Sequence, residues 1–506
     1  MRQQIKSGFW LCVLALCLVS GAVQAQVQVF DNRLEIPWKG ADYLPFVLPA
    51  EDEGLLVFRE DRSAPGRDQR WQFVFYDTAF AQQWQAEATV DRRMTLVRYE
   101  YTEQKLYMLF HDEVGDRLQI LRIYPADGRV QRTEVGTLNK LEINKFVILD
   151  DRIYLAGMLR NNPFVMEVDE EEGRSKVLPS AFGGKSPEIL DIYTSADAET
   201  INVVVQIDQQ KRKAIVIRSY QDDQHQDFMI QPDRDYDLLN GRLAFAEGGM
   251  RVAIGTYAFK NSSNSQGFYF ARFEEGEQVS TRYHSFTGLD NFFSFMTDRN
   301  EERMKARVAR RKSRGKDLKL EYRLLVHDLI QRDDHFVMVG EAYYPVYVSR
   351  QYQSTPYSFY RRRPTIYQQP RLVFDGFRFT HAVVAGIDFK GDLLWDHAFE
   401  LERVKTFKLA QQVRVTEDDK PLSLVYMLDD QVHYTTLQGE EVLISASEEK
   451  VSSGLEHDEV RRTESEKTAY WYGRYFLAYG YQKIRNKKDD GVDTNRKVFF
   501  INKLKY

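Results

Sequence analysis

One unit recurs along almost the whole chain: four segments rich in β-branched and aromatic residues, separated by acidic or glycine-containing turns. Its clearest copy runs from Leu141 to Pro179. Eight such units begin near Gly54, Met94, Leu141, Glu188, Arg242, Tyr322, Ala410 and Leu455. The period, roughly 40 to 50 residues without insertions, is the length of a four-stranded propeller blade. The sequence therefore predicts an all-β fold, a single β-propeller of eight blades, with seven blades as the second choice.

The two ends of the chain complete each other in this interpretation. Lys497 to Tyr506 is a third strand with no fourth strand after it, and Gln26 to Ile36 is a strand that precedes the first unit. We expect residues 26–36 to complete the last blade, because closing the ring removes the exposed sheet edges that favour aggregation. Two separate β-sandwich domains are the alternative fold, which the unbroken order of the units disfavours.

The first 25 residues have the pattern of an export signal. Arg2 and Lys6 precede an apolar run from Phe9 to Val19, and Val23 to Ala25 offer small residues for a signal peptidase. We expect residues 1–25 to be a signal peptide cleaved after Ala25. The mature protein, residues 26–506, is then periplasmic or secreted.

A membrane anchor and a lipoprotein are the other interpretations of this segment. Its apolar run is shorter than the roughly twenty residues that span a bilayer. A lipoprotein would carry its lipid on Cys17, but Leu16 is larger than the residue expected before a lipidated cysteine. Both cysteines, Cys12 and Cys17, lie in this segment. The mature chain therefore has no thiol for a disulfide, a thiolate metal site or a cysteine nucleophile.

The net charge of the chain limits the classes of partner that it is expected to bind. The formal charge is −5, and losing Arg2 and Lys6 makes it −7. A mildly acidic chain of this size is not expected to bind nucleic acid or anionic membrane in general. No later stretch approaches eighteen uninterrupted apolar residues, so we expect no integral membrane span after signal cleavage.

One stretch resembles a known propeller repeat. Between Ala385 and Phe399 an apolar strand ends at Asp388, a turn contains Gly391, and Trp395 opens the next strand. This stretch is similar to the repeat of quinoprotein-like propellers, in which such residues pack and turn. The resemblance implies a propeller fold and nothing about a bound quinone, and we expect no cofactor. More loosely, the mature chain looks like the exported β-propeller proteins of bacterial envelopes.

A basic insertion, residues 296–320, interrupts the repeat. Between Arg299 and Arg323 there are eleven lysines or arginines and four acidic residues. Asp298 and Glu301 suggest a capping box, so a surface helix is predicted from Arg299 to Lys312. A solvated insertion is one interpretation, and a docking surface for an acidic partner is the other. The candidate binding residues on the helix are Arg303, Arg307, Arg310 and Arg311.

A second insertion, residues 345–373, is an Arg/Tyr-rich loop in the same unit. Arginine and tyrosine are enriched at binding surfaces. The alternative is that the tyrosines only pack the loop onto the propeller. Because both insertions interrupt one unit, we expect them to share one side of the ring. Its candidate binding residues are Tyr352, Tyr357, Tyr360, Arg361, Arg362 and Arg363.

No complete catalytic or metal motif occurs. GGKS at Gly183 to Ser186 lacks the earlier glycine of a phosphate loop and is read as a turn. His327, His335, His381 and His397 share one unit without metal-binding spacing, and DDGVDTN (Asp489 to Asn495) is read as a polar turn rather than a calcium loop. No metal is expected.

The sequence therefore favours a non-catalytic binding or scaffold module for an acidic envelope protein or an anionic glycan. The alternative is a glycan-active hydrolase or lyase with carboxylates in the central funnel. Converging carboxylates there, one with a raised pKa, would favour the enzyme, whereas a channel plugged by apolar side chains would favour the binder.

Overall fold

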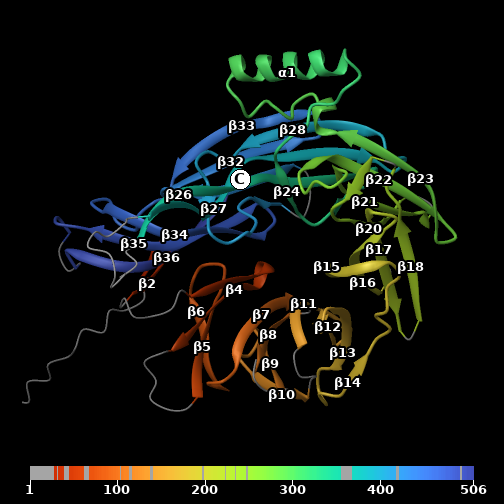
Figure 1. The fold of residues 1–506 in the computed structure, drawn as a ribbon. Coiled ribbons are helices and arrows are strands. Elements are labelled where there is room, and N and C mark those ends of the chain that lie inside the picture. The colour runs from red at the N-terminus through yellow and green to blue at the C-terminus, as the bar shows by residue number, and fades with distance from the viewer. Residues whose placement is uncertain are drawn as a thin grey trace, which may run out of the picture.

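Eight antiparallel sheets follow one another around a ring (Figure 1). The computed structural model describes residues 28–506 except 31, 39–44, 62–67, 103, 113–116, 137–140, 196–198, 223, 234, 247–248, 355–366, 417–420 and 490–492. The chain is an eight-bladed β-propeller, as predicted, and the alternatives of seven blades and of two sandwiches are wrong. The predicted signal peptide, residues 1–25, lies outside the described residues.

The first four blades each contain four strands, ordered from the central channel outward. Blade 1 contains β3 (Phe46–Ala50), β4 (Gly54–Asp61), β5 (Asp68–Tyr76) and β6 (Gln82–Asp91), with the 3-10 turn η1 (Glu51–Glu53). Blade 2 contains β7 (Thr95–Thr102), β8 (Lys105–His111), β9 (Arg117–Ile123) and β10 (Val130–Gly136). Blade 3 contains β11 (Leu141–Leu149), β12 (Arg152–Leu159), β13 (Asn162–Asp169) and β14 (Ser175–Val177). Blade 4 contains β15 (Lys185–Ser195), β16 (Thr200–Gln209), β17 (Arg212–Gln221) and β18 (Gln224–Ile230).

The other four blades include the additions to the repeat. Blade 5 contains β19 (Tyr236–Leu238), β20 (Arg242–Phe245), β21 (Arg251–Phe259), β22 (Ser265–Glu274) and β23 (Glu277–Ser285). The turn η4 (Phe286–Gly288) and helix α1 (Asp298–Lys312) follow it. Blade 6 contains β24 (Arg323–Val326), β25 (Ile330–Gln331), β26 (His335–Ser354), β27 (Tyr367–Asp388), β28 (Leu393–Glu400) and β29 (Lys405–Thr406). Blade 7 contains β30 (Arg414–Val415), β31 (Leu422–Leu428), β32 (Gln431–Gln438) and β33 (Glu441–Lys450). Blade 8 contains β34 (Glu459–Tyr472), β35 (Tyr475–Arg485), β36 (Asn495–Lys505), β2 (Arg33–Pro37) and β1 (Gln28–Phe30).

The hydrophobic core is divided among the interfaces between blades. Eight clusters of buried residues lie between successive sheets of the described chain. Phe58 of blade 1 and Phe110 of blade 2, for example, are fully buried in one of them. Each blade therefore buries both of its faces against its neighbours, which explains why the middle strands are continuous apolar runs.

The ends of the chain meet in blade 8, as predicted. Strand β2 pairs with β36, with Arg33 opposite Asn502 and Pro37 opposite Val498. Leu34 packs in the cluster that joins blade 8 to blade 1. The N-terminal strand therefore closes the ring with backbone hydrogen bonds and with apolar contacts.

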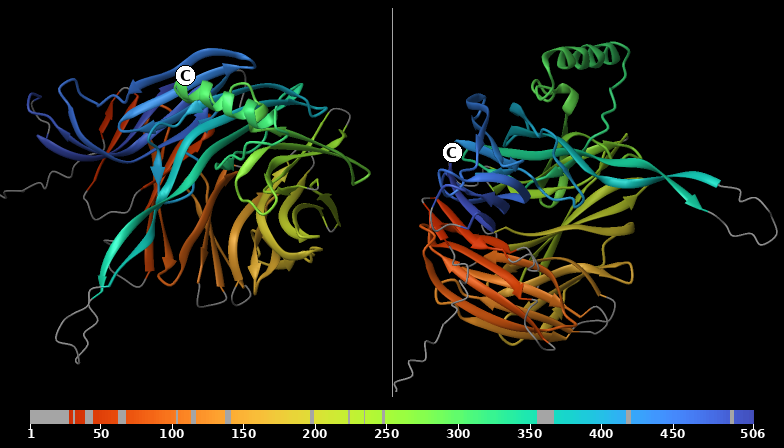
Figure 2. Two further views of the ribbon diagram at one scale, coloured as in Figure 1. Left: turned by 45° about the horizontal axis from the view of Figure 1, so that its top comes forward. Right: turned by 90° about the vertical axis from the view of Figure 1, so that its left-hand side faces the viewer.

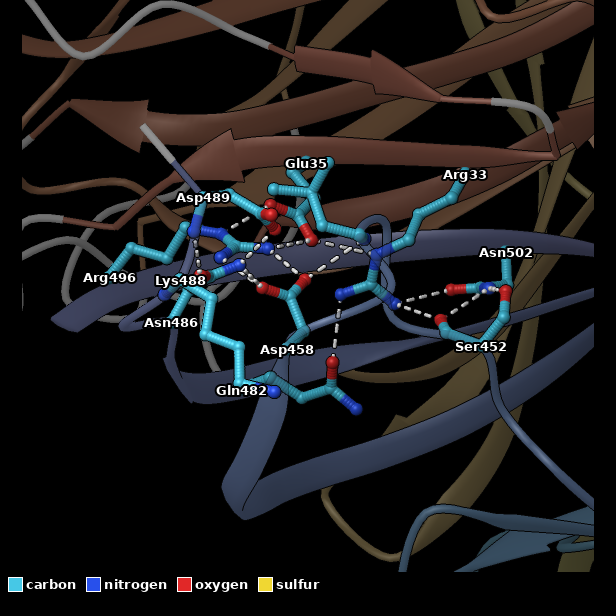
Figure 3. Close-up of polar contacts among 11 residues, drawn as sticks. Arg33, Glu35, Ser452, Asp458, Gln482, Asn486, Lys488, Asp489, Arg496 and Asn502 are labelled. Carbon is cyan, nitrogen blue, oxygen red and sulfur yellow. Dashed lines mark hydrogen bonds and ion pairs between the residues drawn. The ribbon is translucent and has the colours of Figure 1, made fainter. Parts of the chain in front are cut away.

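A buried polar network reinforces this closure (Figure 3). Arg33 is fully buried and donates to Glu35 Oε1 at 2.8 Å, to Asn502 Oδ1 at 2.8 Å and to Gln482 Oε1 at 2.8 Å. Arg496 donates to the second oxygen of Glu35 at 3.0 Å. Charge-assisted hydrogen bonds in such a low-dielectric place are strong, and losing one partner leaves a buried charge without compensation.

Candidate functional site

Helix α1 lies outside the ring on the outer side of blade 6 (Figures 1 and 2). It begins one residue earlier than predicted, because Thr297 is the N-cap. The backbone oxygen of Thr297 accepts the backbone N–H groups of Asn300 and Glu301, and its side chain makes no capping hydrogen bond. The predicted capping box at Asp298 and Glu301 is therefore wrong. Val308 is buried against the cluster between blades 5 and 6, and Met304 packs partly against it. The helix thus rests on a narrow apolar stripe, and most of its surface faces solvent.

The segment before the helix is fixed to blade 6. The backbone N–H groups of Asp290 and Asn291 donate to the carboxylate of Asp396 at 2.9 and 2.8 Å. Lys312 at the other end of the helix donates to the backbone oxygen of Thr287 at 3.4 Å. The segment before the helix is therefore tied to blade 6, and the end of the helix is tied to that segment.

The arginines of the helix are exposed. Arg303, Arg307, Arg310 and Arg311 all face solvent. The Lys305 to Glu301 contact, at 2.8 Å, is the one ion pair that the helix makes among the described residues. The four candidate arginines therefore carry positive charge that no carboxylate of the described body neutralises.

The second insertion is a long hairpin rather than a loop. Strands β26 and β27 continue their pairing far beyond the ring, with Tyr347 opposite Phe374 and Ser354 opposite Tyr367. The rings of Tyr347 and Phe374 lie 5.8 Å apart. Cross-strand aromatic contacts of this kind stabilise a ladder, which is why residues predicted as loop form strand.

The candidate residues of this hairpin are at its far end. Tyr352 belongs to β26, but its side chain lies outside the described part of the structure, as do Tyr357, Tyr360 and Arg361 to Arg363. In Figure 2 the hairpin extends from one face of the ring, whereas α1 stands off the rim. We therefore treat the two insertions as separate surfaces.

The central channel contains a cavity of about 1050 Å³. The innermost segments of blades 2 to 7 line it, and they contribute the charged residues Arg98, Glu100, Lys145, Asp191, Arg242, Asp328 and Arg414. A second cavity of about 810 Å³, lined from blades 1, 2, 7 and 8, shares Tyr99, Glu100 and Arg414 with the first. The channel is therefore polar and open rather than plugged by apolar side chains.

Most of the charges on one side of this channel are paired. Asp191 accepts Lys145, and it also pairs with Arg242 at 2.9 Å. Arg242 contacts Asp328 as well, and its guanidinium lies 4.1 Å from the centre of the Tyr193 ring. These ion pairs connect the inner segments of blades 3, 4, 5 and 6 along the wall of the channel.

Glu100 differs from these residues. It is half-buried, and its carboxyl has no hydrogen bond or ion pair in the described part of the chain. Burial raises the pKa of Glu100, and the negative charge of Asp328 adds to the rise against the opposing effect of Arg98. Glu100, Asp191 and Asp328 thus give the larger cavity three carboxylates, one of which holds its proton more tightly than an ordinary glutamate.

Arg414, like Glu100, lines both cavities. Its guanidinium donates to the backbone oxygen of Thr468 at 3.0 Å and to Gln411 Oε1 at 3.4 Å, and no carboxylate of the described residues pairs with it. Partial burial and the like charges of Arg414 and Lys408 lower the pKa of Lys467. Arg414, Lys408 and Lys467 therefore form a small group of like charges, while Glu51, Asp52 and Glu100 also line the smaller cavity.

The segments Gly183 to Ser186 and Asp489 to Asn495, both read as turns, differ in how far the structure describes them. Gly183 and Gly184 form a bend before β15, with no helix after it. The carboxylate of Asp489 accepts hydrogen bonds from the side chains of His457 and Asn486, each at 2.8 Å. Asp490 lies outside the described residues. Among the described residues no group of three or more His, Cys, Asp or Glu side chains could hold a metal ion. No described helix is long and apolar enough to cross a membrane.

The histidines of blade 6 have separate surroundings. His327 contacts Glu341 at 2.7 Å, and His397 contacts the backbone oxygen of Gly439 at 2.8 Å. His381 is fully buried, with Phe295 stacked on it at 3.8 Å between ring centres and the edge of Tyr322 beside it. Burial lowers the pKa of His381 to about 3.

His381 should make the protein less stable in mild acid. Its pKa falls from 6.5 to about 3 on folding, so below pH 6.5 the unfolded chain binds a proton that the folded chain does not. Stability is fully present above pH 6.5 and decreases by about 1.4 kcal/mol per pH unit as the pH falls toward 3. We expect His381→Gln to flatten this slope in urea unfolding between pH 7 and 4.5. Parallel slopes for the two proteins would contradict the assignment.

The comparisons with known proteins give structural neighbours only. No protein-family model matches the chain, and no curated protein matches it. The dihydro-heme d1 dehydrogenase NirN in complex with DHE has a TM-score of 0.44 at 11% identity, over 91% of this chain and 74% of that one. The polysaccharide lyase Uly1 has a TM-score of 0.39 at 8% identity, over 80% and 89%. The β-propeller domain of the Trilobed protease from Pyrococcus furiosus has a TM-score of 0.34 at 9% identity, over 81% and 95%. At these TM-scores and identities nothing about this chain follows from the likeness, and its propeller fold is established by its own sheet topology.

Proposed function

We propose that this protein is an exported binding module that holds an acidic protein or anionic polymer of the cell envelope against helix α1. The observation that carries the proposal is the set of exposed arginines on α1, which lack carboxylate partners among the described residues. The propeller has a net negative charge, but it holds the arginines of α1 away from its own acidic side chains. An acidic partner is then attracted to one place on the molecule.

The anchoring of the helix supports a recognition role. A helix that served solubility alone would not need Val308 in the core or a carboxylate, Asp396, that fixes the segment leading to it. Because the propeller holds the helix in place, little ordering entropy is lost when a partner binds.

Charge reversal on the helix tests this proposal. We expect Arg303→Glu, Arg307→Glu and Arg310→Glu together to weaken partner binding by about tenfold or more, since rim charges govern association. The measurement is quantitative recovery of partners from envelope extract by the mature protein, at low and at high salt. Binding through exposed cations should decrease as salt screens them.

A matched control separates the helix from total charge. The control reverses the charge of three exposed cations elsewhere on the ring, and it changes the net charge by the same amount: Arg160→Glu, Lys211→Glu and Lys487→Glu. This control should recover the same partners as the unchanged protein. Equal recovery by the helix variant and the control would refute the role of α1, and Arg361→Glu, Arg362→Glu and Arg363→Glu would then test the hairpin.

A second candidate function is a glycan-active hydrolase or lyase that works in the central channel. The observation that favours it is Glu100, a half-buried carboxyl with a raised pKa in an open cavity that also contains Asp191 and Asp328. A carboxyl whose pKa is raised above that of an ordinary glutamate can act as a general acid and protonate a leaving oxygen. Release of reducing ends from envelope glycans, abolished in Glu100→Gln, is the expected result.

A further inference from the structure

We infer that the central channel binds an acidic saccharide, with Arg414 holding the carboxylate of the sugar where the two cavities meet. The inference goes beyond the proposed role of α1, and it rests on the second candidate function only in taking the ligand to be a glycan. It does not require that the ligand be cleaved.

Arg414 is half-buried and has no carboxylate partner among the described residues. Arginine is rarely buried without a counter-ion, because removing its charge from water is costly. The two contacts of Arg414 among the described residues are to a backbone oxygen and to an amide. Lys408 and Lys467 add positive charge nearby. An anion entering the channel would neutralise this group, and a planar carboxylate matches the fork of a guanidinium.

Acidic residues line the same two cavities as Arg414. Glu100 faces the same two cavities as Arg414, and Asp191 and Asp328 line the larger one. These carboxylates would repel a ligand with several negative charges, such as a polyphosphate. They would accept hydrogen bonds from hydroxyl groups. A ligand with one carboxylate and many hydroxyls, which describes a sugar acid, satisfies both sides of the channel.

The smaller cavity has the size and the aromatic lining that suit a saccharide. The partly exposed rings of Tyr99, Tyr101, Tyr470 and Tyr472 line its wall. The side chain of Trp471 is buried between blades 8 and 1, where it donates to the backbone oxygen of Gly54 at 2.8 Å, and it does not face the cavity. Aromatic side chains combine an apolar face, suited to the C–H face of a sugar ring, with a polar group. A cavity of about 810 Å³ is at the upper end of ligand pockets, so more than one sugar unit fits.

The experiment compares saccharides that differ in one charge. Short oligomers of galacturonate, glucuronate and mannuronate are titrated calorimetrically into the full mature protein, each beside its methyl ester, which keeps the shape and removes the charge. We expect at least one acid to bind at least tenfold more tightly than its ester. No preference for any acid over its ester would overturn the inference.

Variants place the binding in the channel. Arg414→Gln is expected to remove the preference for the acid, and Lys408→Gln, an exposed position with no packing role, is expected to weaken it without changing the unfolding midpoint. Arg160→Gln should bind like the unchanged protein. If both channel variants bind the acids normally, the assignment to the channel is wrong.

The same samples separate this site from the other proposals. The α1 variant should keep saccharide binding, and loss of binding there would assign the saccharide to the helix instead of the channel. Assaying reducing ends in the titrated mixtures tests cleavage. Tight binding without new ends supports the channel site and removes the enzyme, whereas cleavage that Glu100→Gln abolishes while binding persists supports both.

Discussion

Replacing Arg33 with alanine is expected to lower the free energy of unfolding by about 3 to 5 kcal/mol, the cost of breaking a buried ion pair by removing one partner. Arg33 is fully buried in the closing blade and contacts Glu35, Gln482 and Asn502 at 2.8 Å each. The alanine variant leaves these three polar groups buried with a lost partner. The change should appear as a lower midpoint in urea unfolding.

The control for Arg33 is another arginine with the same local pairing on the surface. Arg93 pairs with Asp91 at 2.7 Å, two residues away as Glu35 is from Arg33, but it is exposed. Arg93→Ala should leave the urea midpoint unchanged, because solvent screens exposed pairs. If both variants lowered the midpoint equally, burial at the closure would not be the cause.

The second large effect is expected at Glu341. This fully buried residue of β26 accepts the backbone N–H groups of Gln412 and Val413, each at 3.0 Å, together with His327 at 2.7 Å. It therefore ties blade 6 to the segment that leads into blade 7. Glu341→Ala deprives two buried backbone donors and a histidine of their acceptor, and we expect a loss of about 3 kcal/mol or more.

Glu341→Gln separates the hydrogen bonds from the charge. The amide keeps one acceptor oxygen in place, so about half of the loss is expected. The measurement is again the urea midpoint, with the slope of the transition as a check that the same surface is exposed. A loss below about 1 kcal/mol for the alanine variant would show that the inter-blade contact is not needed.

The fold could be predicted because the same pattern of strands recurs in successive blades. The middle strands are apolar on both faces, so their order and spacing are visible in the sequence. The inner strand β3 was not predicted, because its five residues include Pro49 and are too few for a period to emerge. The strand extension of the hairpin was missed since it lies beyond the blade, where cross-strand pairs rather than core packing stabilise the ladder.

The channel site could be predicted only in outline. Glu100 and Arg414 come from blades 2 and 7, so no local spacing relates them. What the sequence does contain is polar residues in the first strand of several units, such as Arg98, Lys145 and Asp191, where an inner strand faces the channel. That signal could have directed attention to the channel, but the pairing of Asp191 and the isolation of Glu100 depend on three-dimensional placement.

The closure in blade 8 also has a consequence during synthesis. Strand β2 leaves the ribosome early, while β36 is made last, and Arg33 and Asn502 are 469 residues apart. Until translation ends, β2 can pair only with the short strand β1, and Arg33 lacks its acceptors on β35 and β36. A chain that stops short of β36 therefore cannot bury its first strand, and it exposes two sheet edges that proteases and chaperones recognise. Only a complete chain can become a protease-resistant ring.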